Sequence, residues 1–185
     1  MLPHVQTSYC HSSLGTAVKI QLEGDIKYYQ GKKLEPSNAG LQEMRCVTDK
    51  DLGSADLMVY MSYIAPCTTP GCTYTAGIAY VSSVCRPNYK NPIKQSINTM
   101  THSLSATAQI VAHEMGHNFG MQHDGDRIRG GTKCKTTEKP QLMAPQINSG
   151  AYPFTWSSCS RKSITNFLDS GAGACLMDHP LQLGI

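Results

Sequence analysis

The sequence is short of charged residues and has no long apolar run. Charged side chains make up 16% of its 185 residues, and the formal net charge is only +3. No run of about five like charges occurs, so nothing indicates nucleic-acid binding. No stretch of about 18 apolar residues occurs, which argues against a membrane span. The opening residues Met1-Leu2-Pro3-His4 also lack the apolar core of a signal peptide.

Cysteine is the residue that this chain has in excess. Eight cysteines in a chain of this length indicate an oxidising compartment. None of them forms a Cys-x-x-Cys pair, which argues against a cysteine-ligated zinc site. The length suffices for one domain with a real core and hardly for two. We therefore expect a single secreted, disulfide-bonded domain.

One motif dominates the sequence, and it reads His-Glu-Met-Gly-His-Asn-Phe-Gly-Met-Gln-His-Asp from residue 113. His113 and His117 are four residues apart, so on a helix both can face one ion. His123 lies six residues further on, which requires a sharp turn, and Gly120 tolerates the φ > 0 that such a turn demands. Three protein ligands leave a fourth position of zinc for water, as in catalytic sites.

Glu114 follows the first histidine and completes the chemistry. Its carboxylate can take a proton from the zinc-bound water as general base and pass it to the leaving amine. A lone His-Glu-x-x-His can arise by chance on an ordinary amphipathic helix, but the longer pattern with the glycine and the third histidine is far more specific. The motif therefore predicts one catalytic zinc.

His-Glu-x-x-His-x-x-Gly-x-x-His is the signature of the metzincin zinc peptidases. With Asp124 after it, the sequence resembles the adamalysin or reprolysin (M12B) branch, which includes the ADAMs, the snake-venom metalloproteases and the ADAMTS proteases. Met143 fits the family's methionine turn beneath the zinc. The C-terminal run from Trp156 to Asp178 resembles ADAMTS catalytic domains most.

The resemblance implies an α/β fold of the α+β metzincin type, with a twisted mixed sheet and an antiparallel edge strand. It implies one catalytic domain over residues 1–185, divided into an upper part (1–123) and a small lower part (124–185). The family's first strand and the helix after it are expected to be missing. The edge strand with Gly77, Ile78 and Ala79 would bind an extended polypeptide, although a purely structural strand is the alternative. The wall of the substrate pocket would begin at Ala144, Pro145 and Gln146.

Periodicity and turn residues predict the elements in order. Residues 1–13 are interpreted as a polar surface arm. The expected elements are a strand at 16–23, a helix opening at 36–38, strands at 57–61 and 74–81, a polar loop at 86–102, the zinc helix at 104–119 and a last helix near 160–170.

The resemblance also implies a set of disulfides and a second metal. The implied disulfides are Cys67–Cys72, Cys85–Cys175 and Cys134–Cys159. The family places the partner of Cys46 in the loop before the zinc helix, where this chain has no cysteine, and the remaining pair is Cys10–Cys46. A structural calcium would be held by Asp56, the backbone of Cys175 and Asp178, or Asp178 is simply a solvated residue.

Two functions follow from these residues. The first is a secreted, monomeric zinc endopeptidase that cleaves extracellular matrix or cell-surface proteins through a water activated by Glu114. The second is a zinc-containing binding module that holds such proteins without cutting. Two kinds of endopeptidase are possible within the first function: a matrix protease and a toxin of venom or saliva type. Retention of Glu114 favours the enzyme, because a non-cutting module has little use for that carboxylate.

Overall fold

The computed structural model describes residues 1–22, 26, 28, 33–51, 55–63, 74–85, 93–126, 134, 141–146 and 153–177, and it shows an α+β fold. The regular elements are α1 (Leu2–Tyr9), the 3₁₀ helix η1 (Ser12–Leu14), α2 (Asn38–Asp51), β1 (Met58–Tyr63), β2 (Gly77–Ala79), β3 (Gln95–Met100), α3 (Leu104–Asn118), α4 (Ser158–Asp169) and the 3₁₀ helix η2 (Ala174–Met177).

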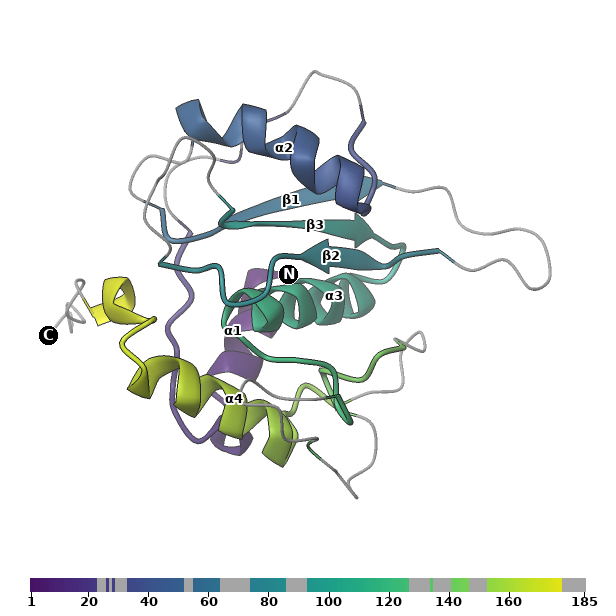
Figure 1. The fold of residues 1–185 in the computed structure, drawn as a ribbon. Coiled ribbons are helices and arrows are strands. Elements are labelled where there is room, and N and C mark those ends of the chain that lie inside the picture. Colours follow the sequence, from purple (N-terminus) through teal and green to yellow (C-terminus); the bar gives the residue numbers. More distant parts are fainter. Residues whose placement is uncertain are drawn as a thin grey trace, which may run out of the picture.

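A mixed sheet separates two layers of helices (Figure 1). Its strand order is β1-β3-β2, with β1 parallel and β2 antiparallel to β3. Helix α2 covers one face, where Leu41 and Met44 pack with Ile97 in a small apolar cluster. Helix α3 lies along the other face, above the larger cluster that joins it to α1 and the C-terminal part of the chain. The predicted antiparallel edge strand is confirmed as β2, at one edge of the described sheet.

The central strand β3 lies where the sequence predicts a polar loop, so that prediction is wrong. Its residues Gln-Ser-Ile-Asn-Thr are all buried, and only Met100 is exposed. Pairing with β1 on one side and β2 on the other satisfies its backbone. The Asn98 amide donates to the Tyr60 carbonyl and the Ser96 hydroxyl. A strand with strands on both sides can thus carry polar side chains when they find partners inside the sheet.

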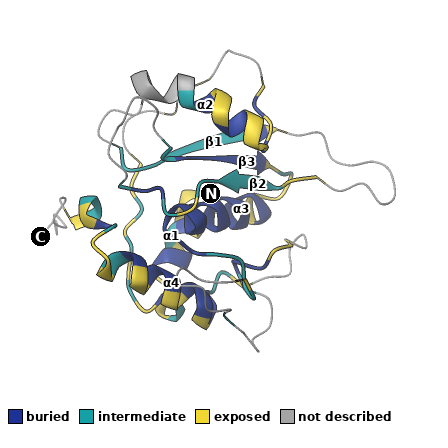
Figure 2. Ribbon diagram, viewed as in Figure 1, coloured by how far each residue is buried: buried dark blue, intermediate teal, exposed yellow. Residues whose placement is uncertain are grey.

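The N-terminal residues form a packed helix, and their interpretation as a surface arm is wrong. Tyr9 is fully buried between the rings of Phe119 and Trp156, at centroid distances of 5.4 and 5.0 Å. The indole N–H of Trp156 donates to the Ser8 carbonyl at 2.7 Å. Figure 2 shows α1 partly buried beside α3. The first turns of the chain therefore belong to the core.

Residues 17–22 are extended but form no strand, contrary to the prediction for 16–23. The alternation is real, since Val18 and Ile20 are half-buried against the core while Lys19 is exposed. Their hydrogen bonds go to α1 instead of a neighbouring strand. Gln6 donates its amide N–H to the Val18 carbonyl and accepts from the Ile20 N–H, and the Val18 N–H donates to the Tyr9 carbonyl.

Two disulfides lie within the described residues. Cys85–Cys175 joins the turn after β2 to the C-terminal 3₁₀ helix, and Cys134–Cys159 joins the segment after the third histidine to α4. The pair Cys10–Cys46 is wrong: Cys10 is a free, exposed thiol whose sulfur accepts a hydrogen bond from the Gln6 amide. Cys10 ends α1 on one side of the sheet, whereas α2, which contains Cys46, lies on the other (Figure 1). Cys67 and Cys72 lie outside the described residues.

No helix in the described ranges combines the length and the apolar character that crossing a bilayer requires.

Candidate zinc site

The first two histidines lie on helix α3, whose residues 106–118 are all buried. The Ser103 hydroxyl caps its N-terminus by accepting from the Ala106 N–H. The helix contacts β3, β2 and α1, and small residues such as Ala108 and Ala112 allow this close packing. His113 and His117 lie on one face, as the four-residue spacing predicts, and both are buried.

A tight turn after α3 returns the chain towards the same face. Gly120 has φ = +88°, and its N–H donates to the His117 carbonyl at 2.8 Å. The Met121 N–H then donates to the Gly116 carbonyl at 2.9 Å, so the last turn of the helix is closed by backbone bonds. The turn brings His123 over the first two histidines, which confirms the role predicted for Gly120.

Replacing Gly120 with alanine should lower the free energy of unfolding by about 1–3 kcal/mol. The positive φ is strained for alanine, and its Cβ would lie 2.9 Å from the Ser82 hydroxyl oxygen. Gly125→Ala is the matched control, because φ is +93° there but nothing lies within 4 Å of the added Cβ. Urea unfolding of both variants should show a larger loss for Gly120→Ala. Equal losses would show that Ser82 yields freely.

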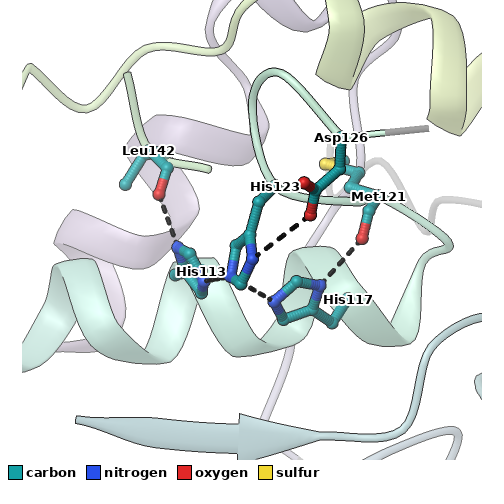
Figure 3. A network of polar contacts seen from close by, with 6 residues as sticks. All are labelled: His113, His117, Met121, His123, Asp126 and Leu142. Carbon is teal, nitrogen blue, oxygen red and sulfur yellow. Dashed lines mark hydrogen bonds and ion pairs between the residues drawn. The ribbon is translucent and has the colours of Figure 1, made fainter. Parts of the chain in front are cut away.

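The three imidazoles converge on one point (Figure 3). The Nε2 atom of His123 lies 3.2 Å from Nε2 of His113 and 3.2 Å from Nε2 of His117. On the outer side of each ring, Nδ1 of His113 donates to the Leu142 carbonyl at 2.7 Å and Nδ1 of His117 donates to the Met121 carbonyl at 2.8 Å. Because a carbonyl only accepts, both Nδ1 atoms carry the proton and both Nε2 atoms present a lone pair.

The electrostatics favour neutral histidines. Burial, reinforced by the neighbouring His117, lowers the pKa of His113 to about 3. Burial likewise lowers the pKa of His117 to about 4. At neutral pH, lone pairs of neutral imidazoles therefore gather in one buried place, which is unfavourable unless a cation lies between them. Imidazole nitrogens are a donor set that suits Zn²⁺, so the three histidines fit the predicted metal.

The carboxylate of Asp126 lies close to the imidazole of His123. Its Oδ2 lies 3.6 Å from Nδ1 of His123, at the more exposed side of the site (Figure 3). Asp126 and the carbonyls of Met121 and Leu142 were not predicted as partners of the histidines. The spacing of three residues after His123 could have indicated Asp126, whereas no side-chain pattern reports where a backbone carbonyl points.

Glu114 follows His113 in α3, and it is 4% exposed. Burial raises the pKa of its carboxyl group to about 8. It sits between the zinc-binding face of α3 and strand β2, where Gly77 comes close to its side chain. A buried carboxyl group with a raised pKa next to a metal-binding cluster is typical of a general base.

Met143 packs against α3, the helix that carries His113 and His117, and its place beneath the zinc stays a prediction. It is fully buried, and a Cβ placed on Gly116 would lie 2.7 Å from its sulfur. Asp124 links Met143 to α4: its N–H donates to the Met143 carbonyl at 2.8 Å, and its Oδ1 accepts from the Ser157 hydroxyl at 2.5 Å. Ser157 is the N-cap of α4, and no pattern in the sequence indicated this contact.

Replacing Gly116 with alanine should weaken zinc binding by about tenfold. The added Cβ would press on the Met143 sulfur, and Met143 adjoins Leu142, whose carbonyl orients His113. We would measure zinc affinity by competition with a chelator of known affinity. An unchanged affinity would show that Met143 moves without disturbing His113.

The predicted substrate-binding residues fall into two groups. Gly77, Ile78 and Ala79 form β2, which packs on α3 beside Glu114. Ala144 is buried after the methionine turn, whereas Pro145 and Gln146 are exposed. The rest of the predicted pocket wall, 147–152, lies outside the described residues.

The predicted calcium ligands are described only in part. Asp56 precedes β1, and Cys175 lies in η2 with its sulfur in a disulfide. Asp178 lies outside the described residues. The calcium site stays a prediction, and so does the division of the domain at residue 123.

The helix, the glycine turn and the three converging histidines fit a metzincin-type zinc site on an α+β fold. A family model described as "Reprolysin (M12B) family zinc metalloprotease" matches residues 63–180. The match covers more than half of the chain, and the chain belongs to this family.

Curated relatives agree with the ADAMTS-like character. "A disintegrin and metalloproteinase with thrombospondin motifs 6" from Homo sapiens is 44% identical over 115 residues, which cover 59% of this chain and 10% of the relative. The protein with the same description and number 7, from Homo sapiens, is 42% identical over 109 residues, 58% of this chain and 6% of the relative. The protein with that description and number 10, from Mus musculus, is 42% identical over 106 residues, which cover 57% of this chain and 9% of the relative. The chain therefore spans about a tenth or less of these relatives.

Proposed function

We propose that this chain is the catalytic domain of a secreted zinc endopeptidase that hydrolyses peptide bonds of extracellular matrix or cell-surface proteins. One observation carries the proposal. Nε2 of His123 lies 3.2 Å from Nε2 of His113 and 3.2 Å from Nε2 of His117, and the buried Glu114 follows His113 in the chain. Disulfides fit an oxidising compartment, and two lie within the described residues.

Each protein group has a distinct part in the reaction. His113, His117 and His123 would hold one zinc, which when bound polarises the scissile carbonyl and acidifies water. Glu114 takes the proton of the attacking water and delivers it to the leaving amine. The surrounding burial keeps bulk water away from the carboxylate, which strengthens its electrostatic interactions. Met143 and Asp124 keep the histidines in place from below.

An extended polypeptide would bind along β2. An edge strand presents backbone N–H and C=O groups to which a substrate can add as a further strand. Gly77, Ile78 and Ala79 supply these groups beside Glu114, and Ala144, Pro145 and Gln146 begin the wall of the pocket. Main-chain pairing tolerates many substrate sequences, so the wall would set the preference. We propose that the domain acts as a monomer.

Cleavage of an unfolded protein by the purified chain tests the proposal. We expect hydrolysis at internal peptide bonds, complete loss of cleavage with a zinc chelator and recovery on adding zinc. The product ends should carry a free amine and a free carboxylate, as identified by mass spectrometry. A chain that binds one zinc but releases no product would favour the non-cleaving binding module instead.

A further inference from the structure

Strand β2 contains a glycine that touches the side chain of Glu114. A Cβ added to Gly77 would lie 2.6 Å from Cγ and 2.6 Å from Oε1 of Glu114, and 2.8 Å from its Cδ. Real Cβ atoms essentially never come within 3.0 Å of another heavy atom. The space that any other residue's Cβ would occupy is therefore filled by the Cγ and the carboxyl group of Glu114.

The backbone gives no other reason for glycine at this position. Gly77 pairs with Asn98 in regular antiparallel register. Among the described glycines, those with positive φ are Gly15, Gly120, Gly125 and Gly171, so Gly77 is not one of them. Alanine adopts an ordinary strand conformation readily, and replacing a glycine there usually stabilises a fold slightly. The requirement for glycine comes from the neighbouring side chain.

Glu114 is the partner that would give way. Its carboxyl group is the mobile end of a side chain, whereas the backbone of β2 is fixed by its pairing with β3. Among the described residues, no hydrogen bond or ion pair to a side chain holds this carboxylate, so packing sets its position. The buried helix α3 lies behind it. A Cβ on residue 77 would therefore move the carboxylate and leave the strand in place.

We propose that Gly77 is a positioning residue for the catalytic base: the missing side chain leaves the space that sets where the Glu114 carboxylate stands. This inference rests on the proposed peptidase function and adds to the main-chain role of β2. A general base must lie within hydrogen-bond reach of the proton that it takes. Relief of the contact would shift the carboxylate by roughly one ångström, and a misplacement of that size can lower a rate by about 10²-fold.

The Gly77→Ala variant should separate catalysis from stability. We expect kcat to fall by about 10- to 100-fold while KM changes little. Zinc content should stay at the level of the unchanged chain, and the Tm should fall only slightly, because the Glu114 side chain takes up the contact. A crystal structure of the variant should show the Glu114 carboxylate displaced and β2 unmoved. A large rise in KM with unchanged kcat would overturn the proposal, because it would place the effect in substrate pairing.

A double-mutant cycle gives the sharper test. Glu114→Ala removes Cγ and the carboxyl group, the atoms that the added Cβ at position 77 would meet. Glu114→Ala alone should be slow, and adding Gly77→Ala should then cost less than about twofold, which makes the two changes strongly non-additive. Equal costs of Gly77→Ala in both backgrounds would contradict the steric explanation.

Failure of this inference differs from failure of the proposed function. If the unchanged chain does not cleave in the presence of zinc, the peptidase proposal fails first. If the unchanged chain cleaves and Gly77→Ala cleaves equally well, with Glu114 in its original position, then the positioning role of Gly77 alone is wrong.

Discussion

Replacing Glu114 with glutamine should lower kcat/KM by about 10²- to 10⁴-fold and leave zinc bound. Glutamine keeps the shape of glutamate but cannot take a proton from water. The three histidines do not depend on Glu114 for their orientation, because His113 and His117 are held by the carbonyls of Leu142 and Met121. Turnover of an unfolded protein substrate, measured together with the zinc content, checks both parts of this prediction.

His117→Ala is the matched comparison for Glu114→Gln. It removes one of the three converging nitrogens, so activity and zinc should be lost together. Full activity of Glu114→Gln would contradict the assignment of Glu114 as the general base. Loss of zinc from Glu114→Gln would instead show that the carboxylate supports the metal site.

Truncating Tyr9 to alanine should lower the free energy of unfolding by about 3–5 kcal/mol, as for other large buried aromatic residues. Tyr9 is fully buried, stands between Phe119 and Trp156, and donates its hydroxyl to the Ala112 carbonyl at 2.9 Å. Such a loss is a large part of the stability of an ordinary domain. Urea unfolding with intact disulfides and excess zinc would measure it.

Tyr9→Phe is the control for the truncation. It keeps the ring and removes only the hydrogen bond to Ala112, so we expect a loss of about 1 kcal/mol. Burial raises the pKa of Tyr9 well above its usual value, so the hydroxyl stays protonated and donates throughout the neutral range. A loss below about 1 kcal/mol for Tyr9→Ala would show that α1 is peripheral to the fold.

The zinc site was predictable from the sequence because its ligands are local. His113, Glu114 and His117 belong to one helix, and Gly120 and His123 follow within one turn. Helical spacing and the conformational freedom of glycine are enough to place such residues. Helix α2 was predictable from the helical spacing of its apolar residues, and strand β1 from its short apolar run.

The polar central strand was not predictable from that pattern. Ser96 and Asn98 are buried in β3, where the Asn98 amide N–H donates to the Tyr60 carbonyl and to the Ser96 hydroxyl. The sequence shows their polarity but not their partners, and polarity without periodicity predicts a loop. The strand predicted at 16–23 was wrong for the opposite reason. The segment with Val18 and Ile20 alternates like a strand, yet its backbone forms hydrogen bonds with the Gln6 side chain of α1.

Contacts between distant segments were the other part that the sequence did not reveal. Tyr9 reaches Ala112, Trp156 reaches Ser8, and Arg161 donates to the Ser13 carbonyl at 2.8 Å. The close approach of Gly77 to Glu114 is of the same kind. Each contact depends on how helices and strands pack, and no local spacing encodes that arrangement.

The most direct measurement is the rate of cleavage as zinc is titrated back into the stripped, purified chain. We expect no cleavage without metal, a rate that rises in proportion to added zinc, and a break at one zinc per chain, because the described residues bring one cluster of three histidines together. Cleavage by the zinc-free chain, or one bound zinc without any cleavage, would contradict the assignment of this domain as a zinc endopeptidase.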